Sequence, residues 1–563
     1  MAGKKTGLTE IPEDPQGLSQ KTGLSRTVCQ LLFNRGFRTA EEISRYLYGS
    51  LRNLPPPSSL PDMEKGVARI RQALSHREKI FLFGDYDVDG VTGTAILQLF
   101  LQSQGGDVSP LLPNRFTDGY GLSHPVIHKV SDGGGRLLIT IDNGTKAEGP
   151  IRFAKEKGID VIILDHHETP ETDPGAIALI NPKKERDEAR QLPLCSAGLA
   201  FYLVAALRAS LRQPGSPPLE SPLIPYLDLV ALGTVADIVP LIGVNRLLVR
   251  EGLKVLSNSS RIGLQRLKEE ASLKEASLST GHIGFRLAPR LNASGRLEDA
   301  SLSLELLTTN DLLRAGALAR QLESINRRRQ EIEEGILQEA EELLEARPPS
   351  DGAGIALARE GWHEGVLGIV AARLTERYAR PALVLTIREN DVKGSGRSIR
   401  GFDLHDCLLD CSSFLDKWGG HKAAVGLTLK KQNLQPFLDQ FSQVSIEKLK
   451  KLDGKSGHRV DLSLPFSDLT PQLIEELAAM EPFGYGNPEP VFRTSSVTIR
   501  SAKIVGKNHL KMILCQDNIT LDSIHFNYRG EIPTQPLCHV TYTPEWNEWN
   551  GNRVIQLRIK EIN

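Results

Sequence analysis

The fold is decided by the stretch Lys79-Ile80-Phe81-Leu82-Phe83-Gly84-Asp85-Tyr86-Asp87-Val88-Asp89-Gly90-Val91-Thr92-Gly93-Thr94-Ala95-Ile96. A short apolar, β-rich run leads into a glycine-framed turn, and an apolar segment with helical spacing leads out, so the pattern predicts strand, loop and helix. The carboxylates of Asp85, Asp87 and Asp89 alternate on the loop and repel one another unless a cation lies among them. The alternative at this point is a solvated acidic turn.

Two further runs of the same kind follow along the chain. Residues 136–141 form an apolar run that ends at Asp142, and residues 160–164 form another that ends at Asp165, His166 and His167. Helical segments separate the runs, and this alternation favours an α/β fold with a parallel, doubly wound sheet. Side chains just past the carboxyl ends of such strands converge in one crevice. We therefore expect residues from all three turns to meet in space.

These turns and one later acid form a candidate metal centre. Its members are Asp87, Asp89, Asp142, His166 and Asp237. Asp237 stands in an otherwise apolar stretch, where a charge is costly unless it is paired or bound to metal. A mixed set of carboxylates and imidazoles suits Mn²⁺, and also Mg²⁺. A carboxylate shared by two ions would fit two-metal phosphoryl transfer. The alternatives are a plain turn at Asp142, a structured loop at the histidine pair and a helix N-cap at Asp237.

Length and composition limit the number of domains and the class of protein. The chain has 563 residues, of which 40% are hydrophobic and 24% charged, and its formal net charge is -1. This length predicts about three or four domains, and this mixture is that of an ordinary globular protein. Any surface for nucleic acid must then be a local basic patch. The six cysteines show no paired framework, and no apolar run reaches about 18 residues. We expect a cytoplasmic protein without a signal peptide or a membrane span.

The predicted organisation has five parts. Residues 1–60 are an N-terminal arm and a small helical segment, closed by the prolines at 55–57, and residues 61–310 carry the doubly wound sheet. Residues 311–347 have apolar positions at helical spacing and predict one long amphipathic helix. The basic run at 327–329 within it could contact phosphate, but a solvated helix face is the preferred interpretation. Residues 348–455 again alternate β and α, and residues 456–563 form the last part.

Glycine-rich segments between residues 348 and 455 are candidate phosphate sites. They are residues 361–368, 393–398 and 418–422, and we expect them to be loops. Glycine backbone can approach a phosphate closely, and the guanidinium of Arg397 can bind two of its oxygens. The alternative is that the glycines only make turns. Trp362 could stack on a base, although a place in the core is the preferred interpretation.

The C-terminal part predicts a small β-barrel. A turn-rich bridge at residues 481–488 precedes several short β-rich runs separated by turns. From residue 493 to 563 there are nine Lys and Arg against six Asp and Glu, interleaved with the aromatic residues Phe526, Tyr528, Tyr542, Trp546 and Trp549. Barrels of the OB type bind single strands through such aromatics over a basic groove. The alternative is that these aromatics belong to the barrel core.

The motifs resemble those of a known superfamily. Asp165-His166-His167, the upstream Gly84-to-Gly90 turn and the downstream Gly233-Thr234-Val235-Ala236-Asp237 are similar to the DHH phosphoesterases. The segments 115–122, 290–296 and 419–421 narrow the resemblance to the RecJ family of single-strand-specific 5′→3′ DNA exonucleases. The resemblance covers nearly the whole chain. It implies a DHH domain, a connecting helix, a DHHA1 domain and an OB-type barrel.

The resemblance also implies roles for individual residues. Asp87 would bind a first ion, Asp142 would bridge, and Asp89, His166 and Asp237 would bind a second ion. His167 would lie beside the scissile phosphate, and Asp85 would assist at the first ion. Many superfamily members have a histidine where this chain has Phe83, so we expect the first ion to bind weakly. The expected substrate-binding residues are Arg115, Arg290, Asn292, Arg296, Ser395, Arg397, Gly420 and His421.

The implied activity is metal-dependent degradation of single-stranded DNA from its 5′ end to 5′-mononucleotides, in recombination and DNA repair. Metal-activated water would attack the phosphodiester, so no protein nucleophile is required. The implied partners are single-stranded DNA, single-strand-binding protein and a RecQ-like helicase, and we expect a monomer. Two alternatives remain open. One is a DHH phosphodiesterase of short oligonucleotides or dinucleotides, and the other is a non-catalytic, Cdc45-like DNA-binding scaffold.

Overall fold

The structure is a computed structural model of the chain. It describes residues 14–563 except 116–118, 120, 186, 188–190, 213–221, 275–276, 453–459, 507, 534–536, 550–551 and 563. Most of the predicted N-terminal arm, part of the segment 115–122 and the side chain of Trp549 lie outside the described residues. Among the described residues, no helix combines the length and the apolar character needed to cross a bilayer.

The first sheet is built as the alternating pattern predicts. Its strands are β1 (Ile80–Gly84), β2 (Val108–Leu111), β3 (Leu137–Ile141), β4 (Asp160–Leu164) and β5 (Ala178–Ile180). They lie in the order β2-β1-β3-β4-β5 and all neighbours pair in parallel. The carboxyl ends of β1, β3 and β4 are therefore adjacent at one edge of the sheet.

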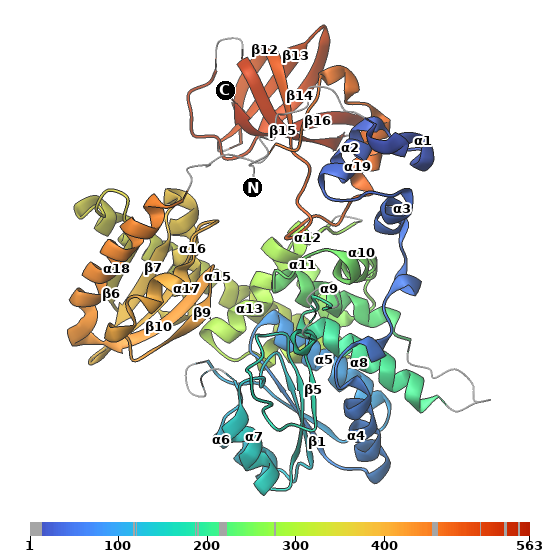
Figure 1. The fold of residues 1–563 in the computed structure, drawn as a ribbon, viewed down its shortest axis with the longest axis vertical. Helices are drawn as coiled ribbons and strands as arrows, with labels where there is room; N and C mark the ends of the chain where they lie inside the picture. Colours follow the sequence, from blue (N-terminus) through green and yellow to red (C-terminus); the bar gives the residue numbers. More distant parts are fainter. Residues whose placement is uncertain are drawn as a thin grey trace.

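Helices cover both faces of this sheet because its strands are apolar on both sides. Ile80 and Leu82 pack into one core with helices α4 (Met63–His76), α5 (Val88–Ser103) and α8 (Ser196–Leu211). Phe81 and Phe83 point to the other face and pack with α6 (His124–Asp132) and α7 (Glu148–Glu156). The predicted doubly wound arrangement is confirmed (Figure 1).

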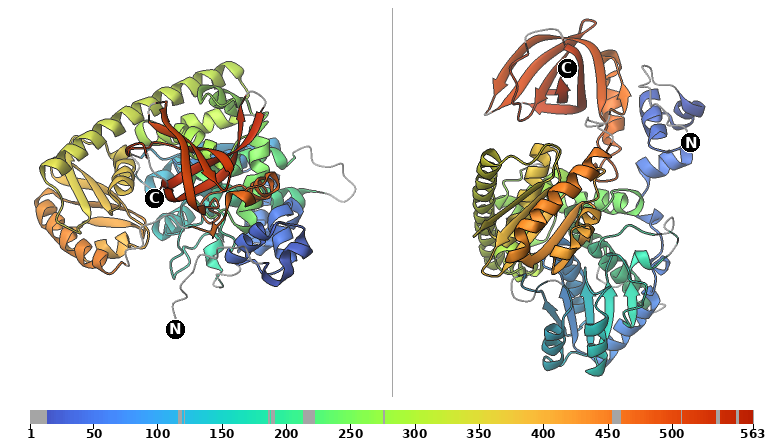
Figure 2. Two further views of the ribbon diagram at one scale, coloured as in Figure 1. Left: turned by 90° about the horizontal axis from the view of Figure 1, so that it is seen from above. Right: turned by 60° about the vertical axis from the view of Figure 1, so that its left-hand side comes forward.

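A layer of helices follows the sheet and leads to the long connecting helix. These helices are α9 (Leu227–Ala236), α10 (Gly243–Ser257), α11 (Ile262–Glu270), α12 (Thr280–His282), α13 (Ala288–Leu297) and α14 (Ser301–Thr308). The connecting helix α15 (Leu312–Ala346) has 35 residues. It runs from this layer to the second α/β unit (Figure 2).

The basic run on α15 is a solvated helix face at Arg327 and Arg328, as the sequence favoured, but not at Arg329. Arg327 pairs with Glu323, whereas Arg329 is buried and binds Glu333 and Asn326. Arg329 is buried because α15 packs against α13 and α16 (Leu367–Tyr378) along its length.

The second sheet has a mixed topology. Its strands are β6 (Ile355–Glu360), β7 (Ala382–Ile387), β8 (Asp391–Arg397), β9 (Lys417–His421) and β10 (Ala424–Lys430), in the order β6-β7-β8-β10-β9. Helices α16, α17 (Leu404–Leu409) and α18 (Leu434–Lys450) pack on it. The glycine-rich segments at 393–398 and 418–422, expected to be loops, lie largely in β8 and β9. That expectation was wrong because the glycines make room for packing. A Cβ at Gly396 would lie 2.4 Å from a Leu383 methyl carbon.

The C-terminal unit is a closed five-stranded barrel of the OB type. It contains β12 (Phe492–Val505), β13 (His509–Gln516), β14 (Ile519–His525), β15 (Leu537–Trp549) and β16 (Asn552–Ile562). The order β12-β13-β14-β16-β15 closes through pairing of β12 with β15. The short β11 (Leu462–Ser463) pairs with β12 at its start, and α19 (Pro471–Ala478) packs beside the barrel.

The N-terminal helices pack on this barrel although more than 400 residues separate them from it. They are α1 (Leu18–Thr22), α2 (Arg26–Asn34) and α3 (Ala40–Tyr48). Leu31 and Leu32 of α2 belong to one hydrophobic core with Phe466, Met480 and Tyr542. Figure 1 shows the three helices beside α19, at the side of the barrel.

Candidate metal centre and phosphate-binding cavity

The segments that follow β1, β3 and β4, together with the end of α9, bring seven titratable side chains together. Three groups each have ligand atoms within 4.8 Å of one another. The groups are Asp85 with Asp87 and Asp142, Asp89 with His166 and Asp237, and Asp142 with His166 and His167. The predicted convergence of these residues is therefore present in the structure, and Asp142 lies in two of the groups.

His166 lies at the centre of this cluster. Its Nε2 atom is 3.2 Å from Asp142 Oδ1, 3.4 Å from Asp237 Oδ2 and 3.9 Å from Asp89 Oδ2. Burial lowers the pKa of His166. The imidazole is thus held in the neutral form that binds metal.

Two helix N-termini support two of the carboxylates. Asp87 is the N-cap of α5, and its side chain accepts a hydrogen bond from Gly90 N at 3.0 Å. Asp89 lies in the first turn of α5 but binds the start of α8, accepting from Ser196 N at 2.7 Å and Ala197 N at 2.9 Å. The positive ends of both helix dipoles therefore face the cluster and offset part of the repulsion among its charges.

Asp142 is held in place by the backbone and by a hydroxyl group. Its φ of 66° is in the left-handed region, which is uncommon for a residue other than glycine and is found at functional sites. The buried Ser196 hydroxyl donates a hydrogen bond to Asp142 Oδ1 at 3.1 Å. Burial and the charges of Asp87 and Asp89 raise the pKa of Asp142 well above its usual range.

Asp237 has no such support from its helix. It is the C-cap residue of α9, so the N-cap alternative considered for it is wrong. A carboxylate at this end faces the negative pole of the helix dipole. Burial and the charges of Asp89 and Asp87 raise the pKa of Asp237 to about 9. Its buried Oδ2 makes no hydrogen bond among the described residues. An ionised Asp237 at this position needs a cation.

The two adjacent histidines differ in their surroundings. His167 Nδ1 lies 2.7 Å from Asp165 Oδ1, and Asp165 also accepts hydrogen bonds from the backbone of residues 145, 166 and 167. Burial opposes charge on His167, but the bond to Asp165 raises its pKa. The same bond, against the effect of burial, holds the pKa of Asp165 at about 2. His166 is therefore suited to bind metal and His167 to face an anion.

A cavity of about 480 Å³ opens beside the cluster and is lined by both α/β units. Asp85, Asp87, Asp142, His167 and Asp237 form its acidic part. Its other polar lining residues are Tyr86, Arg115, Asn292, Arg296, Ser395, Arg397 and Gly420. Predicted substrate residues from both units thus share one space with the predicted metal ligands Asp87, Asp142 and Asp237.

Three arginines of this lining lie close enough to repel one another. Burial and the charges of Arg115 and Arg397 lower the pKa of Arg296 to about 10. Burial and the charge of Arg115 likewise lower the pKa of Arg397. Arg115 is also placed over the ring of Tyr86, at 5.0 Å from its centroid. Clustered guanidinium groups of this kind form a binding site for phosphate oxygens.

The structure explains how the second α/β unit contributes to the cavity. Alternation along β8 sends Gly396 into the core, while Ser395 and Arg397 face the cavity. Gly420 on β9 has a φ of 133°, and a Cβ there would lie 2.3 Å from Ala424 O. Only glycine fits at this part of the wall.

Two predicted substrate residues lie outside this cavity, and Trp362 has the core position that was preferred for it. Arg290 is not among the residues that line the cavity, and its Nε lies 2.6 Å from Glu323 Oε2. His421 lines a neighbouring cavity of about 240 Å³ together with His167. Trp362 is buried in the core, where its Nε1 donates to Glu339, so it does not offer a face to a base.

Sequence reasoning missed three residues that shape this site. Ser196 binds Asp89 and Asp142, Asp165 orients His167, and Tyr86 lines the cavity. Ser196 opens an apolar helical run, and a small polar residue at a helix start is the signal that could have identified it. Asp165 stands beside two histidines after a strand, which is itself a signal for an orienting carboxylate.

The donor set fits divalent metal. Asp85 Oδ1, His166 Nε2 and Asp237 Oδ2 are buried and make no hydrogen bond among the described residues. Carboxylates and one neutral imidazole are ligands of Mn²⁺ and Mg²⁺. Phe83, by contrast, is buried in the core and adds no ligand to the group around Asp85 and Asp87.

Three family models match the chain. The model described as the DHH family, N-terminal domain, matches residues 79–234, the DHHA1 domain matches 351–447, and the RecJ OB domain matches 460–561. The first two matches contain most residues of the cavity lining, and the third contains the barrel. The lining residues Asp237, Asn292 and Arg296 lie between the first two matches.

Relatives match nearly the whole chain. The single-stranded-DNA-specific exonuclease RecJ of Dickeya dadantii is 37% identical and covers 99% of this chain and 98% of its own length. The protein of that name from Bacillus subtilis is 35% identical and covers 97% and 69%. Among solved structures, RecJ of Thermus thermophilus in complex with Mn²⁺ is 30% identical, with a TM-score of 0.83 over 99% of this chain and 78% of that one. The complex of that protein with Mg²⁺ gives a TM-score of 0.78.

Proposed function

The chain belongs to the RecJ family, and we propose that it is a metal-dependent exonuclease that degrades single-stranded DNA from the 5′ end to 5′-mononucleotides. The observation that carries this proposal is the joint lining of one cavity. Four carboxylates with raised pKa values and three mutually repelling arginines line the same space. The first set needs cations and the second needs anions, and a phosphodiester with divalent metal supplies both.

The residues that would hold metal fall into two sets. Asp89, His166 and Asp237 would hold one ion, Asp87 with the help of Asp85 would hold the other, and Asp142 would bridge. When bound, the ions would activate water and stabilise the attacking and leaving oxygens. The group of Asp85, Asp87 and Asp142 has no imidazole, because Phe83 stands where many superfamily members have a histidine. We expect Mn²⁺ titration without DNA to show one tight and one weak site, and two equally tight sites would contradict this.

The other residues of the cavity bind and orient the substrate. Arg115, Arg296 and Arg397 would bind phosphate oxygens, including those of the 5′ end, and Ser395 and Gly420 would shape that part of the wall. His167, kept charged by Asp165, would donate a hydrogen bond to an oxygen of the scissile phosphate. Asn292 accepts a hydrogen bond from Val88 N at 3.0 Å and so holds the start of α5, with its acidic turn, against α13.

The larger setting of this activity is part of the proposal. We propose the division into residues 1–60, 61–310, 311–347, 348–455 and 456–563, a cytoplasmic monomer, and roles in recombination and DNA repair. Single-strand-binding protein and a RecQ-like helicase are the proposed protein partners, since they cover and expose the same strand. Arg290 and His421 are proposed to contact DNA outside the main cavity.

The test uses single-stranded DNA labelled at either end, with Mn²⁺, and compares the native protein with Asp142→Ala. Mononucleotides released from the 5′ end by the native protein alone would support the activity and the bridging ligand. Tight binding without cleavage would replace the proposal by a non-catalytic scaffold. Cleavage restricted to oligomers of a few nucleotides would replace it by the small-substrate phosphodiesterase.

A further inference from the structure

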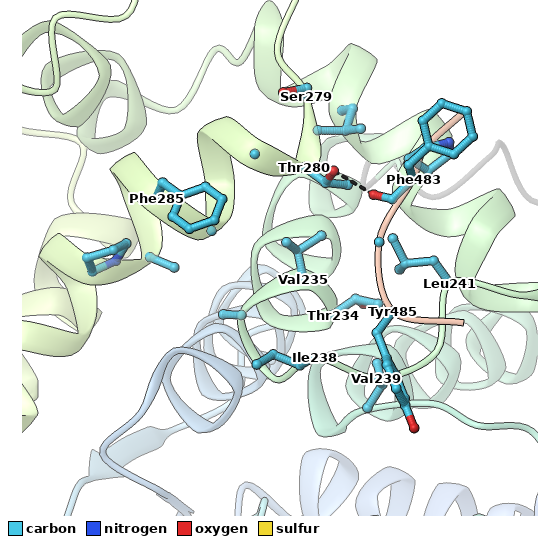
Figure 3. Close-up of a pocket in the computed structure, with 18 of the residues that line it drawn as sticks. Thr234, Val235, Ile238, Val239, Leu241, Ser279, Thr280, Phe285, Phe483 and Tyr485 are labelled. Atoms are coloured by element: carbon cyan, nitrogen blue, oxygen red, sulfur yellow. Dashed lines mark hydrogen bonds between the residues drawn. The ribbon is translucent and has the colours of Figure 1, made fainter. Parts of the chain in front are cut away.

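The segment that joins α19 to β12, here called the bridge (residues 481–489), is fastened to the DHH unit. Leu241 N donates to Tyr485 O at 2.7 Å, and Thr280 Oγ1 donates to Phe483 O at 2.7 Å. Arg246 of α10 donates from its NH2 group to Glu481 O at 2.7 Å. Figure 3 shows the contact between Thr280 and Phe483.

Arg246 also fastens the two elements on either side of the bridge. Its guanidinium donates to Ala479 O at 2.8 Å and to Met480 O at 3.4 Å, just past the end of α19. It further donates to Tyr46 O near the end of α3 and lies over the Tyr46 ring, 4.1 Å from the centroid. One side chain thus joins the DHH unit, the N-terminal helices and the segment that leads into the barrel.

The position of Arg246 is unusual for a charged group. It is only 1% exposed, and the structure gives it no carboxylate partner among the described residues. Its donors are satisfied by carbonyls at the C-terminal ends of two helices, where the helix dipole is negative. This offsets the cost of burying the charge only while the two helix ends stay in place. Arg246 therefore fixes their positions relative to α10.

The bridge forms one wall of a groove of about 820 Å³ that adjoins the active-site cavity. Phe483 and Tyr485 stand on this wall, and Phe285 stands on the opposite one (Figure 3). Asn292 and Arg296 line both the groove and the active-site cavity, and Arg558 of β16 lines the groove at the barrel. The groove thus lies between the active-site cavity and the barrel.

We propose that Arg246, without touching DNA, is the positioning residue that sets this wall, and so determines the affinity for strands long enough to pass from the cavity into the groove. The inference rests on the proposed nuclease function. The groove would then hold the part of the strand on the 3′ side of the scissile phosphate. When the 5′ end is bound at Arg115, Arg296 and Arg397, only that part of the strand continues out of the cavity. A dinucleotide that fits within the cavity does not use the wall.

The test compares two substrates on the full chain. Arg246→Leu should raise KM about tenfold for a 5′-phosphorylated oligothymidylate of about 20 nucleotides, with kcat changed less than about twofold. KM and kcat for the 5′-phosphorylated thymidine dinucleotide should stay within about twofold of the native values. Equal losses on both substrates, or no loss on the long one, would overturn the proposal.

Two further variants keep the test decisive. Arg250→Leu is the matched control, because Arg250 also lies on α10 and binds Leu47 O and Gly49 O of the N-terminal segment but not the bridge. It should not change the ratio of the two KM values.

Thr280→Val is the variant to use if Arg246→Leu does not fold. It removes one hydrogen bond to the bridge and should raise KM for the long substrate about threefold. An unchanged ratio in Thr280→Val would then overturn the proposal. If native protein cleaves neither substrate, the proposed function fails instead.

Discussion

Asp237 is a carboxylate of the site whose ionised form depends on a bound cation. In the metal-free protein its pKa lies near 9, against a usual value of 3.8. The unfolded chain loses this proton first, so the stability of the metal-free protein falls as pH rises between those two values. Asp237→Asn removes this loss. We expect its melting temperature in EDTA to exceed that of the native protein by a few degrees at pH 8, and by much less at pH 5.

Scanning calorimetry at both pH values checks this expectation. Asp439→Asn on α18 is the control, since Asp439 is exposed and far from the cluster in the chain. A gain of equal size at both pH values would mean that repulsion in the acidic cluster is not the cause. Excess Mn²⁺ should reverse the order of the two proteins at pH 8, because Asp237 is then a ligand.

Ser196 acts on the same cluster through hydrogen bonds. Its hydroxyl orients the proposed bridging carboxylate of Asp142. Removal of such an outer hydrogen bond typically costs about 10–100-fold in metal affinity, and we expect that loss for Ser196→Ala in Mn²⁺ binding measured by calorimetry. Ser210→Ala is the matched control on the same helix, since the Ser210 hydroxyl donates to Leu207 O of its own helix. Unchanged affinity in Ser196→Ala would show that the hydroxyl does not position Asp142.

At the scale of the element, two adjacent residues of strand β8 have different roles: Gly396 contributes to packing, and Arg397 contributes to binding. Gly396→Ala places a Cβ against Leu383, Val425 and Leu404, and overpacking of this kind costs about 1–3 kcal/mol. Arg397→Ala removes a side chain that faces the cavity. We expect the first variant to lose melting temperature and the second to lose affinity for 5′-phosphorylated single-stranded DNA at least tenfold. Thermal melts and equilibrium binding separate the two effects, and equal loss of melting temperature in Arg397→Ala would argue against its role.

The same strand shows what could not be predicted from the sequence. The first sheet was predictable because its strands are apolar runs with glycine-framed turns, and the ends of parallel strands determine where the acids meet. Strand β8 contains Gly394, Ser395 and Gly396, which lack the β-branched character of a strand. Its pairing with β7 and β10 provides the stabilisation that local propensity does not.

The hydrogen bonds from Ser196 to Asp89 and Asp142 could not be predicted from the sequence for a related reason. Asp89 and Ser196 are 107 positions apart, and Asp142 and Ser196 are 54 apart. Such a bond exists only once α5, β3 and α8 have packed together, so no local pattern records it. The placement of Arg290 against Glu323 depends in the same way on the packing of α13 against α15.

At the scale of the whole molecule, the two ends of the chain fold against each other. Helix α2 completes the core that includes the barrel, so the N-terminal helices and the barrel should gain and lose structure together. Leu31→Ala removes a fully buried side chain of that shared core and should cost about 2–5 kcal/mol. Hydrogen exchange should then show faster exchange in β12 and β15, with the parallel sheet unchanged.

Leu264→Ala tests the opposite half. Leu264 of α11 is fully buried in the core on one face of the parallel sheet, so its loss should speed exchange around that sheet and spare the barrel. If Leu31→Ala affected only α1, α2 and α3, the N-terminal helices would be an independent appendage. If both variants affected every strand alike, the chain would unfold as one unit. The expected pattern instead makes the N-terminal helices and the barrel one body, which the bridge and Arg246 hold over the active-site cavity.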